Sequence, residues 1–512
     1  MKDEKRMAGW PVDDSHCPAA ARREIWNMAN ETHEATIAAE DEQAASRTAG
    51  EAGWHVSRYN LSAPVPGTKK VAIANLFKGN CAEYTPIELY LLSVLDELDE
   101  HHPIIERFSK RGIIANFDER AALETMGRAA CAMPGGVGMT ICPTMGCNFD
   151  CPYCFEDHRV GLMTQQVQDD VVALADRMLD VSGARSLMVT WFGGEPLLAP
   201  RIIEALSERL MAVAEEHNAK YSAGIITNGY LLTAENFAML ERVKVDNIQV
   251  TIDGLGATHD ATRRLVGGGA TFDRIIGNLR DNKYSMRVNV RHNVHEGNRD
   301  EVEELRAFIE KLAEESGNDL SYYPAPVAAS EVADNRGEQV GLLCETNMSE
   351  IGIMQEAGRF RGAHGHYCGA NSIWVVGIDE KGNLQKCWEA VDKPHLSFGT
   401  ARDWDPKNPL GTTTNLDNLT SYLNTANPVN DPECRECVWL PYCAGGCPYK
   451  RLHAERMCLA FKDDAEGYVL ALHARIGEKK KAEAAKQAEA EQEAEAGQAA
   501  GVAVEAADGT DN

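Results

Sequence analysis

The sequence has no run of the roughly 20 apolar residues that a helix needs to cross a bilayer. Its first residues, Met1 to Arg6, lead into no apolar stretch, so we expect no secretory signal. Positive charge is scarce, because 51 Lys and Arg stand against 78 Asp and Glu, a formal net charge of −27. An anionic surface repels phosphate backbones. We therefore expect a cytoplasmic protein that binds neither nucleic acid nor membrane.

Cysteine is abundant, with 15 among 512 residues. Cytoplasmic thiols are kept reduced, so metal or redox chemistry explains this number better than disulfides do. The content of 44% hydrophobic and 25% charged residues is ordinary for a globular chain of two or three domains.

Composition divides the chain into five parts. We expect a polar lead-in over 1–53, a small α+β module over 54–130, an alternating strand–helix domain over 131–330, a cysteine-rich domain over 331–465 and a low-complexity charged tail over 466–512. In the small module we expect strands at 55–61 and 71–77, a helix at 86–99, a second helix and a short strand at 112–114.

Strand and helix patterns alternate in the largest part. Candidate strands are 138–142, 187–191, 224–227, 247–252, 287–291 and 320–323, with helices near 165–180, 199–216, 233–243, 271–282 and 299–315. Repeated βα units predict a parallel sheet covered by helices. Six units favour the α/β class and a partial (β/α)6 TIM-like barrel, with chemistry at the C-terminal strand ends. A Rossmann-type sheet is the alternative, but no Gly-x-Gly-x-x-Gly turn follows the first strand.

The densest motif is Cys147-x3-Cys151-x2-Cys154, directly after the first barrel strand. Closely spaced thiolates can wrap an iron–sulfur cluster, which normally takes four cysteine ligands. Three cysteines would leave one iron open for a substrate or cofactor. A structural zinc site is the alternative, with Cys142 or His158 as fourth ligand, but this spacing is unusual for zinc.

These cysteines resemble the signature of the radical S-adenosylmethionine (SAM) family, which also has an aromatic residue before the third cysteine. The segment after the second strand looks like the family's Gly-Gly-Glu-Pro segment, which contacts the SAM amino group. By this resemblance the cofactor-binding positions are Tyr153, Gly193, Gly194, Glu195 and Pro196. Further cofactor-binding candidates at the strand ends are Thr227, Asn228 and Asp253, which can face the SAM ribose or the substrate, and Arg291, which can clamp a carboxylate. The resemblance implies that a reduced 4Fe–4S cluster gives an electron to SAM, and that a 5′-deoxyadenosyl radical then takes hydrogen from the substrate.

A second cysteine set closely resembles the SPASM domain that follows some radical SAM barrels and normally holds two auxiliary 4Fe–4S clusters. The resemblance assigns Cys368, Cys387 and Cys447 to the first cluster, and Cys434, Cys437, Cys443 and Cys458 to the second. The first cluster then lacks a fourth ligand. Either Cys344 reaches it, or the site is open and binds a substrate thiolate. Zinc ribbons are the structural alternative.

Two SPASM groups differ in substrate: maturases of ribosomally made peptides (RiPPs) and anaerobic sulfatase-maturing enzymes, which form formylglycine. The second group usually has no acid at the position of Glu156, and has Asp at the position of Glu389. Both departures favour peptide maturation, with a thioether or related cross-link as the expected product, although Glu389 remains a candidate base.

The small module loosely resembles the leader-binding region of peptide maturases, with Tyr59-Asn60 and Gly112-Ile113-Ile114 as the matching segments. Its sheet edge can accept an extended leader peptide. A purely structural cap over the barrel is the alternative. The expected partners are a precursor peptide and an external electron donor such as ferredoxin or flavodoxin. A hypothesis of another class is a non-catalytic iron–sulfur or zinc scaffold.

Overall fold

The computed structural model describes residues 48–327, 363, 368–454, 456–459 and 461–481. These residues form two compact units. Residues 48–119, 363 and 461–481 belong to the first unit, and 120–327, 368–454 and 456–459 to the second.

The first unit has a three-stranded antiparallel sheet in the order β2-β3-β4, and a two-stranded pair of β1 and β5. Its elements are β1 (His55–Val56), β2 (Asn60–Pro64), β3 (Val71–Asn75), β4 (Asn80–Tyr84), α2 (Pro86–Ser93), η2 (Leu95–Glu97), α3 (Pro103–Arg111) and β5 (Ile114–Ala115). Where we expect one strand over 55–61, two short strands form. They separate at Arg58, whose backbone N–H donates to the carboxylate of Glu119 instead of to a neighbouring strand.

Helix α2 begins with a capping box. The Thr85 hydroxyl accepts from the backbone N–H of Glu88, whose carboxylate accepts from the backbone N–H of Thr85. The two side chains satisfy backbone donors that the first helical turn leaves unpaired. Helix α3 ends at Gly112, whose φ of 76° lies in the left-handed region that favours glycine.

The C-terminal helical residues 465–481 belong to the same unit. All five residues of β3 are buried, so both faces of its sheet are covered. Ile73 and Tyr84 lie on the face that packs with α2 and α3. Cys81 and Glu83 lie on the other face, because side chains alternate along a strand. There His473 contacts Glu83 at 3.0 Å, so the late helix covers the early sheet.

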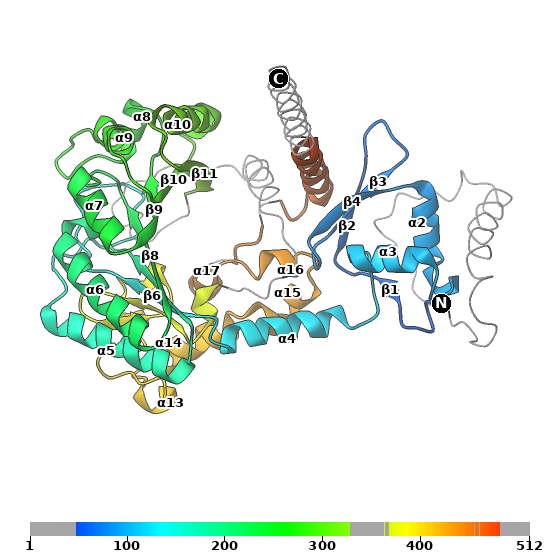
Figure 1. Ribbon diagram of the computed structural model, residues 1–512, viewed down its shortest axis with the longest axis horizontal. Helices are drawn as coiled ribbons and strands as arrows, with labels where there is room; N and C mark the ends of the chain where they lie inside the picture. Colours follow the sequence, from blue (N-terminus) through cyan, green and yellow to red (C-terminus); the bar gives the residue numbers. More distant parts are fainter. Residues whose placement is uncertain (1–47, 328–362, 364–367, 455, 460, 482–512) are drawn as a thin grey trace, which may run out of the picture. The chain divides into compact units, whose positions relative to one another are not determined.

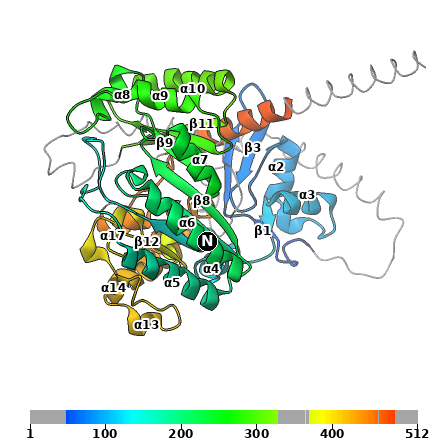
Figure 2. The same cartoon turned by 60° about the vertical axis from the view of Figure 1, so that its left-hand side comes forward.

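The second unit contains six parallel strands in sequential order, and the first five are each followed by helix. The strands are β6 (Val137–Ile141), β7 (Ser186–Trp191), β8 (Lys220–Thr227), β9 (Val245–Thr251), β10 (Arg287–Val294) and β11 (Leu320–Pro326). The helices are α5 (Gln165–Ser182), η3 (Pro196–Leu198), α6 (Pro200–Glu216), α7 (Ala234–Arg242), α8 (Ala257–Thr262), α9 (Phe272–Asp281), η4 (Arg299–Glu301) and α10 (Val302–Ser316). Figures 1 and 2 show α5 to α10 outside the strands.

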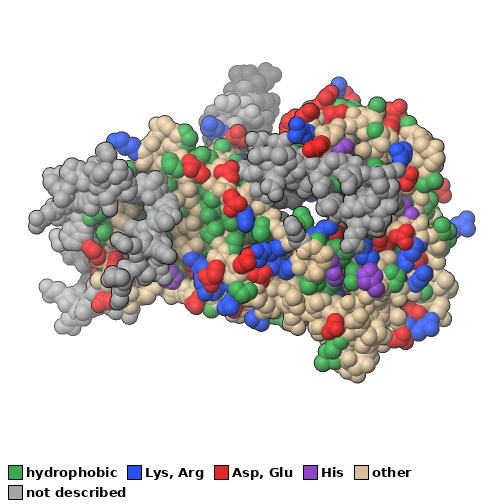
Figure 3. Space-filling model, turned by 180° about the vertical axis from the view of Figure 1, so that it is seen from behind, with side chains coloured by type: hydrophobic (Ala, Val, Ile, Leu, Met, Phe, Trp, Pro, Cys, Tyr) green, Lys and Arg blue, Asp and Glu red, His purple; other side chains and the backbone are tan. Residues whose placement is uncertain are grey.

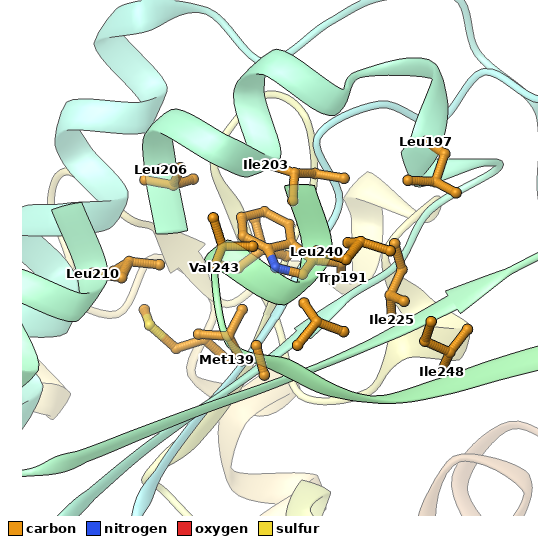
Figure 4. Close-up of a cluster of buried hydrophobic side chains, with 14 of the residues drawn as sticks. Met139, Trp191, Leu197, Ile203, Leu206, Leu210, Ile225, Leu240, Val243 and Ile248 are labelled. Atoms are coloured by element: carbon orange, nitrogen blue, oxygen red, sulfur yellow. The ribbon is translucent and has the colours of Figure 1, made fainter. Parts of the chain in front are cut away.

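This order confirms the α/β class and the partial TIM-like barrel. A doubly wound Rossmann sheet reverses its strand order at the middle, whereas here each strand pairs with the next one in the chain. The core between strands and helices is apolar (Figure 4). Trp191 of β7 lies there with Ile203 and Leu206 of α6, all fully buried. Burying such side chains stabilises the fold by about 1.5–3 kcal/mol each.

Three further strands extend the sheet beyond β6. They are β12 (Val375–Ile378), parallel to β6, and the antiparallel β13 (Asn383–Gln385) and β14 (Gly399–Thr400). The cysteine-rich region is therefore joined to the barrel by backbone hydrogen bonds. The remaining elements are α4 (Glu119–Ala132), η5 (Gly369–Asn371), η6 (Trp388–Ala390), η7 (Pro394–Leu396), α13 (Pro409–Thr412), α14 (Leu416–Thr420), η8 (Ser421–Thr425), η9 (Pro428–Asn430), α15 (Pro432–Glu436), α16 (Leu440–Cys443) and α17 (Pro448–His453).

Two expected boundaries fall inside helices. The one at 130 lies within α4, nearly all of which belongs to the second unit, and the one at 466 lies within helical residues 465–481. Among the described helices none has the length and apolarity to cross a membrane. Acidic and basic side chains of described residues are intermixed on the face in Figure 3.

Candidate active site

The loop after β6 carries the cysteine triplet. Bridges from Thr144 to Leu162 and from Phe149 to Leu265 close this loop at its base and fix it to the loop after β9. The loop therefore starts at the C-terminal end of the first barrel strand, as we expect. Cys142 is fully buried just before it.

The three thiols of the triplet are neighbours. Burial raises the pKa of Cys147 to about 12, and the negative charges of Glu195 and Cys151 add to this. Burial likewise raises the pKa of Cys154 well above its ordinary value, with contributions from Glu156, Cys151 and Cys147. Such thiols ionise readily only when a metal replaces the proton. Three adjacent thiols are a donor set that fits three irons of one cluster.

Within the described residues, no three Cys, His, Asp or Glu side chains converge as ligands of a single metal ion do. A 4Fe–4S cluster bonds each cysteine to a different iron. The assignment of the three cysteines as cluster ligands therefore rests on their closeness to one another.

The Gly-Gly-Glu-Pro segment lies directly against the cysteine loop. A Cβ atom at Gly193 would lie 2.1 Å from the carbonyl oxygen of Thr144, and one at Gly194 would lie 2.5 Å from that of Gly146. The backbone N–H of Glu195 donates to the Gly146 carbonyl at 2.9 Å. Only glycine allows this approach, so the two glycines fix the backbone immediately before the first cysteine.

The Glu195 carboxylate is fully buried and joins two strand ends. It accepts hydrogen bonds from the Thr227 hydroxyl at 2.8 Å, the backbone N–H of Asn228 at 2.7 Å and the backbone N–H of Leu197 at 3.0 Å. Burial raises the pKa of Glu195, and these donors oppose the rise. The Asn228 amide also donates to Asn148 in the cysteine loop at 2.8 Å. Three segments that we expect near SAM are thus brought together, while Pro196 begins the short η3.

A second buried network lies at the ends of β9 and β10. The Tyr153 phenol donates to the Asp253 carboxylate and accepts from Arg263 at 2.8 Å and from the Asn293 amide at 3.2 Å. The backbone N–H of Asn293 donates to Asp253 at 3.0 Å. Arg291 donates to the Asn293 side chain at 2.7 Å.

Sequence reasoning missed Arg263. Arg263 is 9% exposed at its side chain and its neighbour Arg264 is 36% exposed. Nothing in the local sequence indicates which of these two arginines is buried. The guanidinium of Arg263 lies 3.9 Å from Asp253 and 5.6 Å from the ring centre of Phe149.

The second cysteine set separates into two groups. Burial raises the pKa of Cys387, and the charges of Cys368, Glu389 and Cys447 raise it further. Burial raises the pKa of Cys443 to about 11, with contributions from Cys434, Cys437 and Cys458. This is the division that the resemblance implies. Cys344 lies outside the described residues.

Glu389 lies beside the group of Cys368, Cys387 and Cys447. Its carboxylate is 3.6 Å from the ammonium of Lys450. The ammonium of Lys393 donates a hydrogen bond to the Glu389 carbonyl at 2.9 Å. It also lies 5.8 Å from the ring centre of Phe155 and 5.9 Å from that of Tyr449. Lys393 therefore contacts the residue after Cys154 and the segment after Cys447 at once.

Comparison with known proteins agrees with this geometry. Residues 141–309 match the model of the radical SAM superfamily. The chain carries a radical SAM domain over these residues. The family resemblance found in the sequence is thereby confirmed.

Curated relatives match different portions of the chain. A GTP 3′,8-cyclase of Synechococcus sp. (strain WH7803) is 34% identical over 139 residues, 26% of this chain and 38% of the relative. A pre-heme d1 synthase of Dinoroseobacter shibae is 26% identical over 201 residues, 38% of this chain and 45% of the relative. The chain thus spans less than half the length of these two. A cysteine-type anaerobic sulfatase-maturating enzyme of Clostridium perfringens is 24% identical over 361 residues, 63% of this chain and 89% of the relative.

Two solved structures are similar in part. Native anSMEcpe with bound AdoMet and Cp18Cys peptide is 19% identical, with a TM-score of 0.49 over 66% of this chain and 98% of that one. Streptococcus suis SuiB bound to precursor peptide SuiA is 15% identical, with a TM-score of 0.41 over 77% of this chain and 95% of that one.

Proposed function

We propose that the protein is a radical SAM peptide maturase with one SAM-binding cluster and two auxiliary clusters. The observation that carries the proposal is the grouping of ten of its described cysteines into sets of three, three and four, with the first set at the mouth of a radical SAM barrel. We assign this maturase activity to the cytoplasm, where thiols stay reduced. The proposed electron donor is ferredoxin or flavodoxin.

In this proposal Cys147, Cys151 and Cys154 hold the SAM-binding cluster. The cluster, when bound and reduced, supplies the electron that cleaves SAM to methionine and a 5′-deoxyadenosyl radical, which takes a hydrogen atom from the substrate. The segments of Gly193–Pro196 and Thr227–Asn228, together with Asp253 and Arg291, bind and orient SAM. The network around Glu195 holds the first two of these segments in place before SAM arrives, which reduces the entropy lost on binding.

The proposed substrate is a ribosomally made peptide, and the favoured product is a thioether. Forming this bond removes one hydrogen from a thiol and one from a carbon. The carbon-bound hydrogen would leave as an atom to the 5′-deoxyadenosyl radical, giving 5′-deoxyadenosine, and the thiol proton would go to Glu389 as the base. An auxiliary cluster held by the second cysteine set would supply the acceptor for the one remaining electron. The edges of the β2-β3-β4 sheet are the proposed leader-binding positions, because an edge strand offers unpaired backbone groups. The peptides bound in the SuiB and anSMEcpe structures are ligands of those proteins, and a peptide substrate for this chain is our proposal.

A second candidate is anaerobic sulfatase maturation. It is favoured by the match to the Clostridium perfringens enzyme, which extends over 89% of that relative. Glu389 stands where such enzymes usually have Asp, which favours the peptide maturase. The two candidates are separated by supplying a Cys-rich precursor peptide and a sulfatase-derived peptide in parallel. A product lighter by two hydrogens and lacking a free thiol supports the first, and an aldehyde captured by a hydrazide supports the second.

The test of the SAM-binding assignment replaces all three cysteines of the triplet by Ala. We expect 5′-deoxyadenosine formation to be abolished, while Cys81→Ala, in the first unit, leaves it intact. Metal analysis of anaerobically purified protein should find about twelve irons for three clusters. A few zincs and no SAM cleavage would instead support a scaffold protein.

A further inference from the structure

His158 contacts the sulfur of the third cysteine. Its Nε2 atom lies 3.2 Å from the Sγ atom of Cys154. His158 is half-buried, on the segment that runs from Cys154 to the bridge at Leu162 closing the loop. A second sulfur of the triplet also has a polar neighbour, since the backbone N–H of Phe149 donates to Cys147 at 3.4 Å.

The chemistry of a cluster ligand fixes the direction of this contact. A cysteine sulfur bonded to iron has lost its proton and can only accept a hydrogen bond. The Nε2 atom of His158 must then carry the hydrogen. Hydrogen bonds to cluster sulfurs are among the features that set reduction potential, because they stabilise the more negative, reduced state.

We infer that His158 is a positioning residue of the SAM-binding cluster, whose Nε2–H donates to the Cys154 thiolate and raises the reduction potential of that cluster. The inference rests on the proposed cluster at the triplet. A higher potential eases transfer of an electron to the cluster from the external donor. The contact also restrains the Cys154 side chain within the loop.

The test compares His158→Phe and His158→Gln in the full chain, purified without oxygen. The signal followed is the part of the reduced-cluster electron paramagnetic resonance spectrum that changes when SAM is added. In His158→Phe we expect the ratio of reduced to oxidised cluster at a fixed potential to fall up to about tenfold, or about 59 mV for a one-electron couple. His158→Gln keeps an N–H donor, so it should recover part of the shift. The control His101→Phe changes an exposed histidine of the first unit and should change nothing.

The outcomes separate this inference from the proposed function. A wild-type chain without iron at the triplet would overturn both. A wild-type chain that binds iron and cleaves SAM, with an unchanged potential in His158→Phe, would overturn the role of His158 alone. Strong coupling of the cluster to a histidine nitrogen would also overturn it, because His158 would then be an iron ligand and not a hydrogen-bond donor. Should His158→Phe lose its iron, the glutamine variant decides: a potential near the wild-type value is expected, and a full fall of about 59 mV despite the retained N–H donor would contradict the inference.

Discussion

The phenol of Tyr153 donates a hydrogen bond to the carboxylate of Asp253, 100 residues further along the chain. Tyr153 directly precedes the third cysteine of the triplet, and Asp253 follows the fourth barrel strand. The bond therefore ties the cysteine loop to the opposite part of the barrel. Arg263 completes the contact, because its guanidinium donates to Tyr153 and lies beside Asp253.

Asp253→Asn should destabilise the second unit strongly. The substitution leaves the buried Arg263 cation without its carboxylate, and breaking a buried pair in this way costs about 3–5 kcal/mol. Chemical denaturation of the anaerobic protein measures the change. The matched control is Asp150→Asn, because Asp150 pairs with Arg264 at an exposed position, 3.7 Å away. Its loss should cost less than about 1 kcal/mol. Equal effects of the two variants would contradict the buried-pair interpretation.

Gly194→Ala should disturb the cysteine loop. The new Cβ atom would lie 2.5 Å from the carbonyl oxygens of Met145 and Gly146, which belong to backbone and cannot rotate away. Overpacking of this kind costs about 1–3 kcal/mol. We expect a lower unfolding midpoint and less iron at the triplet after reconstitution. Gly135→Ala is the control, because no atom lies within 4 Å of its new methyl group. Full iron binding by Gly194→Ala would show that the loop does not need this close contact.

The two auxiliary groups should lose iron independently. Cys387→Ala and Cys443→Ala should each remove about four irons, and the double variant about eight. The reason is that the thiols around Cys387 and those around Cys443 form separate neighbourhoods. Iron analysis with Mössbauer spectroscopy measures the loss. A double variant that loses no more iron than either single one would mean that both cysteines serve the same cluster.

Glu389→Gln tests the proposed base. Glutamine keeps the size of the side chain but cannot take a proton, so peptide conversion should fall by about 10²–10⁴-fold. Iron content and SAM cleavage without peptide should stay unchanged, as measured by mass spectrometry and by 5′-deoxyadenosine formation. Glu310→Gln, at an exposed position of α10, should have no effect. Unchanged peptide conversion in Glu389→Gln would exclude Glu389 as the base.

Acid should weaken the barrel through His292. This residue is fully buried, with its Nδ1 atom 2.8 Å from the Tyr322 hydroxyl, and burial lowers its pKa from 6.5 to about 4. As the pH falls below 6.5, His292 binds a proton in the unfolded chain but not in the folded chain. The free energy of unfolding therefore decreases until the pH reaches about 4. Between pH 7 and pH 5 this contribution amounts to about 2 kcal/mol.

The measurement compares wild type with His292→Phe, which does not titrate, by urea unfolding at both pH values. The variant should lose about 2 kcal/mol less than wild type on acidification. An equal loss in the two proteins would show that His292 is not responsible.

The sequence predicts the barrel well because its strands are short apolar runs that alternate with amphipathic helices, as at Leu187–Trp191 and Pro200–Glu216. The cysteine neighbourhoods follow from spacing, since closely spaced thiols in one loop must lie near one another. Contacts made by the tertiary fold leave no such pattern. The burial of Arg263 beside an exposed Arg264 depends on where the loop after β9 meets the cysteine loop. The sequence does not predict strand β12 either, because its pairing partner, β6, lies more than 200 residues earlier.

The cover that residues 465–481 give to the β2-β3-β4 sheet has a consequence for synthesis. The ribosome releases the strands early and the helix almost 400 residues later, so the face carrying Cys81 and Glu83 stays uncovered while the second unit emerges. During that interval an apolar surface is available to chaperones or to a neighbouring nascent chain. The first unit can complete its folding only after translation has passed the cysteine-rich region.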